Sequence, residues 1–204
     1  MPTLIKRNDH HELELSGLGN RRAVQVLTDL VRSKGPTVLF LMKTKLSIQE
    51  MEPIKNEIGF NSMLAVLSIR RSGGIPLLWK NSVTVDPQTF SLNHIDVYIS
   101  APLQEQWRLT GVYGHPGDQR KKETWELMRH LQSWTMKLWV CIRDFNEVLQ
   151  SNEKRGGLAK PLSVMQEFWS ALLHCDLANL GYQGYTYTWR NGHFGDDFVE
   201  QRLE

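Results

Sequence analysis

A carboxylate and a carboxamide stand two residues apart in the sequence, at Asp144 and Asn146. They follow residues 138–142, a short apolar run typical of a buried strand. Side chains at i and i+2 of an extended segment point the same way, so the carboxylate can orient a water or accept its proton while the amide donates to a phosphate oxygen. This pairing suits phosphodiester hydrolysis. Asp and Asn are also common turn residues after a strand, so a structural turn stays open as the alternative.

The elements around these residues predict one α/β domain. Helical and strand-like patterns alternate along the sequence, without an internal repeat or a low-complexity linker. Asn20 can cap a helix that ends at Gly35, and Ser47 with Glu50 forms a capping box that begins a second helix. Residues 37–42 are apolar without alternation, as expected of a central strand covered on both faces.

The middle of the chain predicts a sheet built largely of antiparallel neighbours. Turn signals such as Ser72-Gly73-Gly74 and Asp86-Pro87 separate a series of β-rich runs. These runs are residues 63–69, 75–79, 83–85, 95–99 and 107–113.

Two further helices are expected in the second half of the chain. One begins near Asp118, and the other begins at Ser163, where Gln166 completes a second capping box. Helical spacing in the second one predicts that five apolar side chains face inward: Met165, Phe168, Trp169, Leu172 and Leu173.

The composition bounds the class of protein. The 204 residues carry 24 Lys and Arg against 22 Asp and Glu, a net charge of +2, so any basic surface must be local. Cys141 and Cys175 are far apart and do not make a disulfide framework.

No export signal or membrane-length apolar run occurs, which predicts an intracellular protein, nuclear or cytoplasmic, without a membrane partner. The sequence lacks the P-loop, GxGxxG, HExxH and CxxC patterns, so it does not support nucleoside triphosphatase, dinucleotide-binding or zinc sites.

A set of segments in one order carries more information than any single motif. Together these segments resemble the endonuclease domain of plant non-LTR (LINE-type) retrotransposons, in the endonuclease/exonuclease/phosphatase superfamily. The segments are Gly17-Leu18-Gly19-Asn20, residues 38–46, Arg71-Ser72-Gly73-Gly74 with Leu77-Leu78-Trp79-Lys80, Asn93-His94-Ile95-Asp96, residues 111–116, residues 141–147 and residues 186–192.

The resemblance implies a DNase I-like, four-layer α/β sandwich over residues 13–204, after a poorly matched segment at residues 1–12. It also implies a Mg²⁺-dependent endonuclease that nicks DNA. No residue here matches the histidine that completes the family's catalytic site, and the last strands of the sandwich are missing, so a C-terminally truncated fold is expected.

Carried over position by position, the resemblance assigns three catalytic residues. Asp144 matches the aspartate that activates the attacking water, Asn146 the asparagine that contacts the phosphate, and Tyr113 the active-site tyrosine. The candidate substrate-binding residues are Asn191, Arg190 and His115.

The departures from the family pattern fall on the metal site. Lys43 occupies the position of the metal-binding glutamate, and Glu14 replaces an asparagine near the metal. An ammonium cannot coordinate Mg²⁺ and repels it. If both positions lie at neighbouring strand ends, Glu14 and Lys43 form an ion pair where the family binds its metal. Arg143 also replaces the glycine that precedes Asp144.

The resemblance and its departures together predict a degenerate, inactive retrotransposon endonuclease-like domain whose partner is DNA. Losing groups that act as a unit removes most of a rate enhancement rather than a share of it. Three alternatives remain open from the sequence: a weakly active nuclease, a non-catalytic nucleic-acid-binding remnant, and a phosphatase of the same superfamily.

Overall fold

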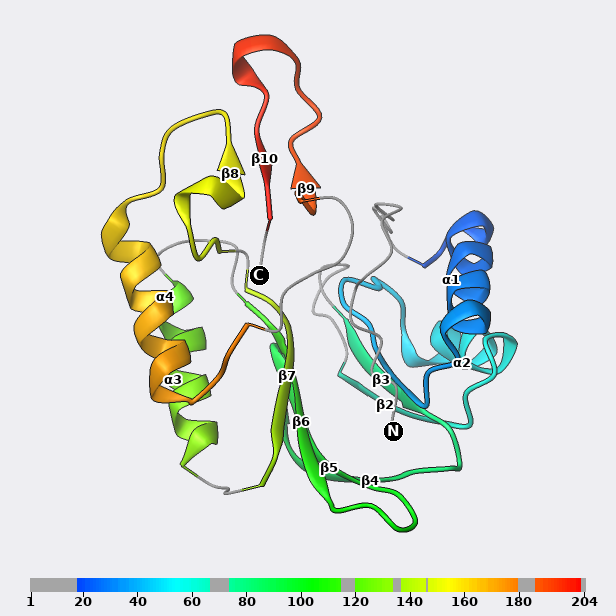
Figure 1. The fold of residues 1–204 in the computed structure, drawn as a ribbon. Helices are drawn as coiled ribbons and strands as arrows, with labels where there is room; N and C mark the ends of the chain where they lie inside the picture. The colour runs from blue at the N-terminus through cyan, green and yellow to red at the C-terminus, as the bar shows by residue number, and fades with distance from the viewer. Residues whose placement is uncertain are drawn as a thin grey trace. The chain divides into compact units, whose positions relative to one another are not determined.

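A computed structural model describes residues 18–66, 74–114, 120–133, 137–145, 147–179 and 186–202 (Figure 1). These residues form two compact units, each described by itself. The first contains residues 18–113 and 137–142, and the second contains residue 114, residues 120–133 and residues 143–202.

The first unit holds two helices and two sheets. The helices are α1 (Arg21–Lys34) and α2 (Ile48–Glu57). One sheet is antiparallel in the order β1-β3-β2, from β1 (Val38–Phe40), β2 (Ser62–Val66) and β3 (Ile75–Trp79). The other has the order β4-β5-β6-β7, from β4 (Thr84–Ser91), β5 (His94–Ser100), β6 (Trp107–Tyr113) and β7 (Trp139–Asp144). The last two residues of β7 belong to the second unit.

Both helices of the first unit begin at the predicted caps. The Asn20 side chain accepts a hydrogen bond from the Arg22 N–H, and Gly35 ends α1 in the left-handed conformation with φ of 57°. The capping box of Ser47 and Glu50 is present at the start of α2. Local hydrogen bonds of short polar side chains therefore set where these helices start, as the sequence indicates.

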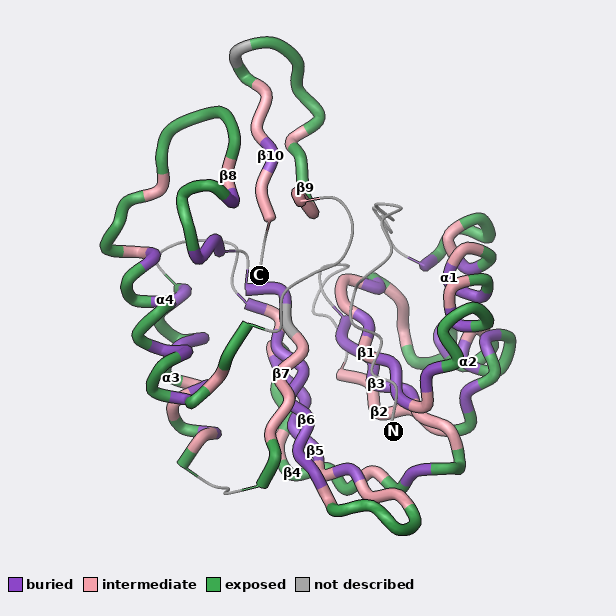
Figure 2. The backbone as a smooth tube through the Cα atoms, in the orientation of Figure 1, coloured by how far each residue is buried: buried purple, intermediate pink, exposed green. Residues whose placement is uncertain are grey.

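Two apolar layers hold the first unit together. Leu27 of α1 and Met51 of α2 share one buried cluster with Leu39 and Leu78 of the first sheet. The second cluster joins the two sheets, and β5 and β6 are buried along most of their length (Figure 2). A Cβ built on Gly111 would lie 2.3 Å from the Phe40 ring, so only glycine lets this ring pack against the second sheet.

The face of the second sheet opposite this cluster carries a buried polar network. Asp96 accepts two hydrogen bonds from Arg108, at 2.8 Å from Nε and 2.9 Å from Nη2. Thr110 donates to the same carboxylate, and Trp139 Nε1 donates to the Thr110 hydroxyl at 2.8 Å. The network therefore links β5, β6 and β7, and its charged groups are paired as buried charges must be.

The turn signal at Asp86-Pro87 is wrong, because both residues lie inside β4. Proline cannot donate a ladder hydrogen bond, but β4 is an edge strand with a single neighbour in the sheet order. The register with β5 shifts between Pro87 and Thr89, so the strand accommodates Pro87 with an irregularity.

The second unit packs two helices against the residue that follows β7. The helices are α3 (Lys121–Gln132) and α4 (Leu162–His174). The Trp125 and Phe168 rings stack at 4.7 Å, and Phe145 meets them edge-on at 5.1 Å and 4.9 Å. A small antiparallel sheet has the order β8-β10-β9, from β8 (Lys154–Arg155), β9 (Trp189–Arg190) and β10 (Glu200–Gln201).

The start of α4 differs from the prediction. Its N-cap is Pro161, whose carbonyl accepts from the Val164 and Met165 N–H groups, and no side chain caps this helix. The fixed φ of proline suits a helix start, so the helix begins before Ser163. Trp169 and Leu173 are 40% and 72% exposed rather than inward, since α4 carries apolar residues on more than one side. None of the described helices is long and apolar enough to cross a membrane.

His94 sits buried at the turn between β4 and β5. Its ring nitrogens lie 2.7 Å from the Ser91 hydroxyl and 3.0 Å from the Thr89 hydroxyl. Burial lowers the pKa of His94 below its usual 6.5, Asp96 opposes this shift, and Arg108 adds to it.

The stability of the chain should therefore decrease as the pH falls below about 6.5. In that range the unfolded chain binds a proton at His94 more readily than the folded chain, so acid favours unfolding. Thermal melting between pH 7.5 and pH 5.5 is the measurement, with His94→Gln expected to show a flatter profile. The exposed His174→Gln should retain the wild-type profile. Equal profiles for all three proteins would contradict the prediction.

Candidate active site

Two of the predicted catalytic residues end neighbouring strands. Tyr113 is the last residue of β6, and Asp144 is the last residue of β7. The Arg108 N–H donates to the Leu138 carbonyl near the start of these strands, and the Gly114 N–H donates to the Asp144 carbonyl at their ends, both at 2.8 Å. The strands therefore run in the same direction.

In the first unit, a backbone hydrogen bond holds Tyr113 in place. Its N–H donates to the Asn93 carbonyl at 2.8 Å, and its side chain is half-buried against the second apolar cluster. In the other unit, Asp144 is buried. Asn146, His115 and Glu14 lie outside the described residues, so the predicted ion pair of Glu14 with Lys43 stays a prediction.

Gly114 controls how closely the chain approaches the end of β7. A Cβ on this residue would lie 2.8 Å from Phe145 Cα and 2.9 Å from its carbonyl oxygen. These are backbone atoms, which cannot rotate away as a side chain can. The hydrogen bond from Gly114 to Asp144 therefore depends on the absence of a side chain.

Lys43 lies beside Tyr113 in the first unit. Its Nζ is 5.2 Å from the centre of the tyrosine ring, within the range of a cation–π interaction. Its backbone has φ of 57°, in the left-handed region that only a few per cent of non-glycine residues adopt. The family resemblance singles out Lys43 because its charge is opposite to that of the expected glutamate. The sequence does not predict its left-handed backbone conformation.

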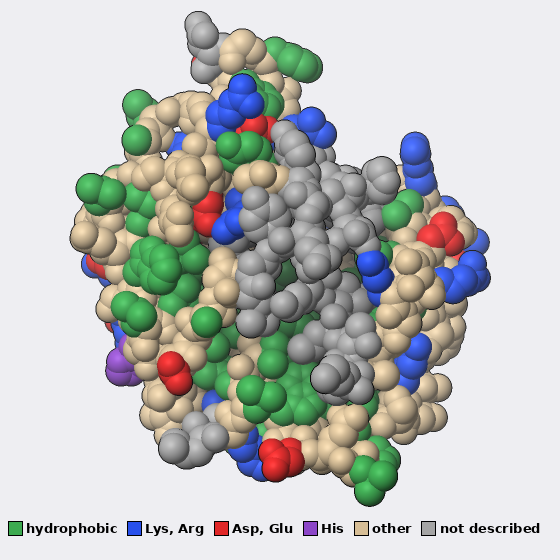
Figure 3. All heavy atoms as spheres, viewed as in Figure 1, with side chains coloured by type: hydrophobic (Ala, Val, Ile, Leu, Met, Phe, Trp, Pro, Cys, Tyr) green, Lys and Arg blue, Asp and Glu red, His purple; other side chains and the backbone are tan. Residues whose placement is uncertain are grey.

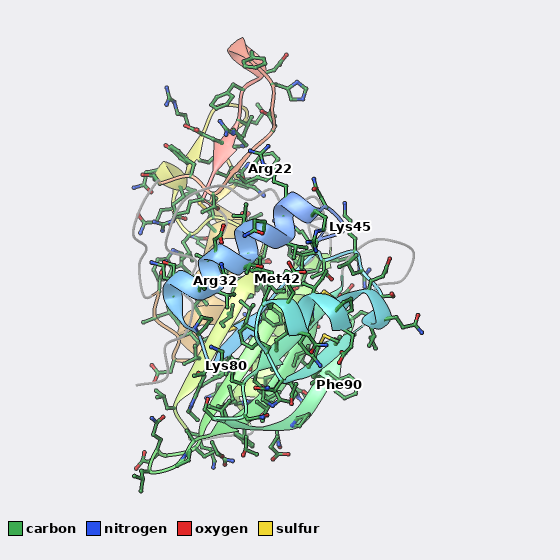
Figure 4. The ribbon with its side chains drawn as sticks, turned by 90° about the vertical axis from the view of Figure 1, so that its right-hand side faces the viewer. Arg22, Arg32, Met42, Lys45, Lys80 and Phe90 are labelled. Atoms are coloured by element: carbon green, nitrogen blue, oxygen red, sulfur yellow. The ribbon has the colours of Figure 1, made fainter. Side chains whose placement is uncertain are left out.

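The neighbours of Lys43 fix this conformation. Thr44 is buried, its N–H donates to the Gly74 carbonyl, and its carbonyl accepts from the Leu18 N–H. Lys45 is also left-handed, with φ of 56°, but it is exposed and lies at the edge of the first unit (Figure 4). Strained backbone of this kind persists where the surroundings over-determine it.

The described residues do not fit the Mg²⁺ that the family resemblance implies. A cation, the Lys43 ammonium, lies 5.2 Å from the centre of the Tyr113 ring. Lys43 is also the position that the resemblance assigns to a metal-binding glutamate. Within the described ranges no group of three or more His, Cys, Asp and Glu side chains could hold a metal ion. Magnesium prefers several oxygen ligands in octahedral geometry.

The predicted substrate-binding residues Arg190 and Asn191 lie in the second unit. Arg190 is exposed on β9, whereas the Asn191 side chain bonds within the hairpin between β9 and β10. Asn191 Nδ2 donates to the Asp197 carbonyl at 2.7 Å, and Oδ1 accepts from the His193 and Val199 N–H groups. Asn191 therefore shapes the hairpin.

The small sheet of the second unit carries an exposed surface, of which only Arg190 is a candidate from the sequence. Arg155 and Arg190 are the register partners of Glu200 on its two sides. Phe194, in the hairpin, is 92% exposed, and Trp189 is partly exposed. Figure 3 shows basic and hydrophobic side chains together in this region. We name this set (Arg155, Trp189, Arg190 and Phe194) the basic-aromatic surface.

A side chain at Gly114 should disturb the end of β7. Gly114→Ala would place Cβ against the Phe145 backbone, and such overpacking lowers the free energy of unfolding by about 1–3 kcal/mol. Gly19→Ala is the matched control, because its Cβ would meet only Leu46 Cδ2 at 3.8 Å. Urea denaturation measures both variants. A Gly114→Ala protein as stable as Gly19→Ala would show that the backbone relaxes without cost.

Comparisons with known proteins support the fold. No family profile and no curated protein matches the sequence. Three solved structures are similar. AP endonuclease LMAP from Leishmania major has a TM-score of 0.61 and 14% identity, and the match covers 79% of this chain and 64% of that chain. The endonuclease domain of TRAS1, a telomere-specific non-LTR retrotransposon, has a TM-score of 0.60 and 13% identity, and the match covers 89% of this chain and 80% of that chain. D. rerio TDP2 complexed with a single-strand DNA product has a TM-score of 0.57 and 12% identity, and the match covers 88% of this chain and 73% of that chain.

This chain thus spans 64% of the length of the LMAP chain. Identities of 12–14% are too low to transfer an activity, but the similarity extends over most of this chain. The expected fold class is confirmed: the chain has an α/β, DNase I-like fold, which it shares with these solved structures.

Proposed function

We propose that this chain is a degenerate endonuclease-like domain, of the kind carried by plant non-LTR retrotransposons, that binds DNA without hydrolysing it. The observation that carries the proposal is the Lys43 ammonium, 5.2 Å from the centre of the Tyr113 ring. A fixed cation at this point opposes the entry of a dication, which metal-dependent hydrolysis requires.

The electrostatics of this site favour phosphate over metal. Two positive charges close together repel each other, whereas an ammonium and a phosphate oxygen attract and can form a charge-assisted hydrogen bond. A lysine in place of a metal ligand therefore disfavours a bound metal ion but attracts a phosphate group. Tyr113 and Asp144 remain in the sequence, but a catalytic group that has lost its partners supplies little of the original rate enhancement.

The basic-aromatic surface supports DNA as the partner. Arginine side chains contact phosphates, and exposed aromatic rings can stack on bases. Arg155 and Arg190 flank Glu200, and Phe194 and Trp189 expose apolar rings. Two of the similar structures are a retrotransposon endonuclease domain and a protein complexed with a DNA product.

A plasmid assay tests both parts of the proposal. The purified chain should not nick supercoiled plasmid in Mg²⁺ or Mn²⁺, yet it should bind DNA in fluorescence anisotropy, with an affinity that falls steeply as salt rises. Asp144→Ala, purified identically, reports contaminating nuclease, and circular dichroism shows that both proteins are folded. Nicking that disappears in Asp144→Ala would establish a residual nuclease instead. Folded protein that does not bind DNA would refute the proposed function.

The role of Lys43 can be tested by reversing its charge. Lys43→Glu should gain a Mg²⁺-dependent increase in melting temperature, because a carboxylate replaces the repelling ammonium. Lys45→Glu is the matched control, with the same charge change and nearly the same φ at an exposed position. Equal responses of the two variants to Mg²⁺ would show that Lys43 is not what opposes the metal.

A further inference from the structure

The helix α4 carries an exposed apolar stripe besides the side that packs into the second unit. Leu162, Trp169 and Leu173 are 69%, 40% and 72% exposed on this helix. Figure 3 shows hydrophobic side chains gathered on the left of the view, where α4 lies. Aligned along one helix, such side chains form a patch of the kind that marks an interaction site. The buried residues of the helix, which face the core instead, are Met165, Phe168, Ala171 and Leu172.

The exposed stripe follows the spacing of a heptad. Leu162, Gln166, Trp169 and Leu173 succeed one another at intervals of four, three and four residues. Residues at these intervals lie on one line along a helix and form the inward-facing positions when two helices pair. We name these four residues the α4 seam. None of them is charged, so a second helix can pack along the seam without burying a charge.

The α4 seam reads the same in both directions. An antiparallel copy of the helix, related by a two-fold axis through its middle, therefore meets the seam in register. Leu162 of one copy then faces Leu173 of the other, and Gln166 faces Trp169. A two-fold dimer requires such self-complementarity, whereas an unrelated partner does not.

Gln166 favours this register over others. It is three residues from Trp169, so in the antiparallel pair the two Gln166 side chains lie about 4.5 Å apart along the helix axis. Each amide carries both donors and an acceptor, and two of them can therefore pair with each other. A register in which Gln166 faces a leucine would leave the amide unpaired, which costs free energy. One polar residue in an apolar seam commonly sets the register in this way.

Trp169 is already ordered for such a contact. Its Nε1 donates to the Leu149 carbonyl at 3.0 Å, which fixes the ring while the residue stays 40% exposed. A side chain that is fixed in the free protein loses little entropy on binding. Tryptophan is also among the residues that contribute most to protein interfaces.

Charge and size set the expected strength of the pairing. Glu167 is the one acidic residue of α4, and it pairs with Lys122 of α3 at 3.4 Å rather than facing the seam. Antiparallel helices also bring the positive end of each helix dipole to the negative end of the other. Three large apolar side chains from each copy make a small interface, so we expect a dissociation constant on the order of 10–100 μM.

We propose that the α4 seam is a homodimer interface, at which two copies of this chain pair through antiparallel α4 helices. The occupant is a second copy because the seam is complementary to itself, carries no charge and holds a polar residue that can pair across the two-fold axis. This pairing needs neither DNA nor a metal.

Sedimentation velocity tests the pairing at protein concentrations from about 5 to about 300 μM, which bracket the expected dissociation constant. The wild-type chain should shift from monomer to dimer over this range. Leu162→Glu and Leu173→Lys should each raise the dissociation constant about tenfold or more, because each places an unpaired charge in the seam. Both positions are exposed in the monomer, and each new charge suits the nearby end of the helix dipole, so both variants should fold.

A mixture of the two variants tests the orientation. In an antiparallel pair the introduced carboxylate of Leu162→Glu faces the introduced ammonium of Leu173→Lys. An equimolar mixture should therefore associate about as well as the wild type, although neither variant does so alone. A parallel pair would bring each position against its own equivalent, and mixing would restore nothing.

Leu138→Glu is the matched control, because Leu138 is 74% exposed but belongs to the first unit. It should dimerise like the wild type. A wild-type chain that stays monomeric over the whole range would overturn the inference, and so would a dimer that Leu162→Glu leaves intact. Two folded variants that do not associate when mixed would overturn it as well.

Circular dichroism shows whether each variant is folded. If Leu162→Glu or Leu173→Lys is not, Gln166→Glu takes its place, because it brings two like charges together near the two-fold axis. Gln166→Glu should also raise the dissociation constant about tenfold. An unchanged dissociation constant in this variant would refute the antiparallel pairing.

Discussion

The ion pair of Asp96 with Arg108 is the constraint on which the strands of the second sheet depend. It is buried within the sheet, so any register other than the observed one would leave one of these charges unpaired. Thr110 and Trp139 extend the same network to β7. The middle parts of β5, β6 and β7 are therefore fixed by polar contacts, whereas the ends of β6 and β7 are held by backbone hydrogen bonds, from Tyr113 to Asn93 and from Gly114 to Asp144.

The chain uses buried or half-buried lysines in two different ways. Lys121 and Lys160 both face the Glu147 carboxylate, whose one negative charge offsets one of their two positive charges. Lys43 contacts the face of an aromatic ring, which attracts a cation without cancelling its charge. Lysine thus forms ion pairs with a buried carboxylate in the second unit and a cation–π contact in the first.

Local signals in the sequence predicted much of the fold. Asn20, Ser47 and Glu50 cap helices where expected, because a cap is decided by residues three or four apart. The pattern at Ser163 does not predict the start of α4 correctly, because Pro161 is the N-cap and no side chain caps this helix. Asp86-Pro87 predicts a turn from local residue types, but it lies in β4, because β4 is an edge strand and an edge strand accepts proline. Edge position is a property of the whole sheet and not of the local sequence.

The candidate site was less predictable than the fold. Lys43, Tyr113 and Asp144 were identified as candidates by resemblance to a family, but the contact between Lys43 and Tyr113 depends on a left-handed backbone that no local pattern of residues indicates. The sequence also does not predict the burial of Glu147, because a glutamate is usually exposed. Its charge is paired with Lys121, the first residue of α3, and with Lys160, just before α4, which lie 26 and 13 residues away along the chain. Composition and periodicity do not report such contacts.

The irregularity at Pro87 has a consequence for how the molecules behave toward one another. An edge strand presents unpaired backbone groups that a strand from another molecule could extend into a continuous sheet. Proline removes one donor from β4, and the register shift before Thr89 interrupts its ladder. Both features make β4 a poor template for intermolecular strand pairing, so this edge is protected against aggregation at high protein concentration.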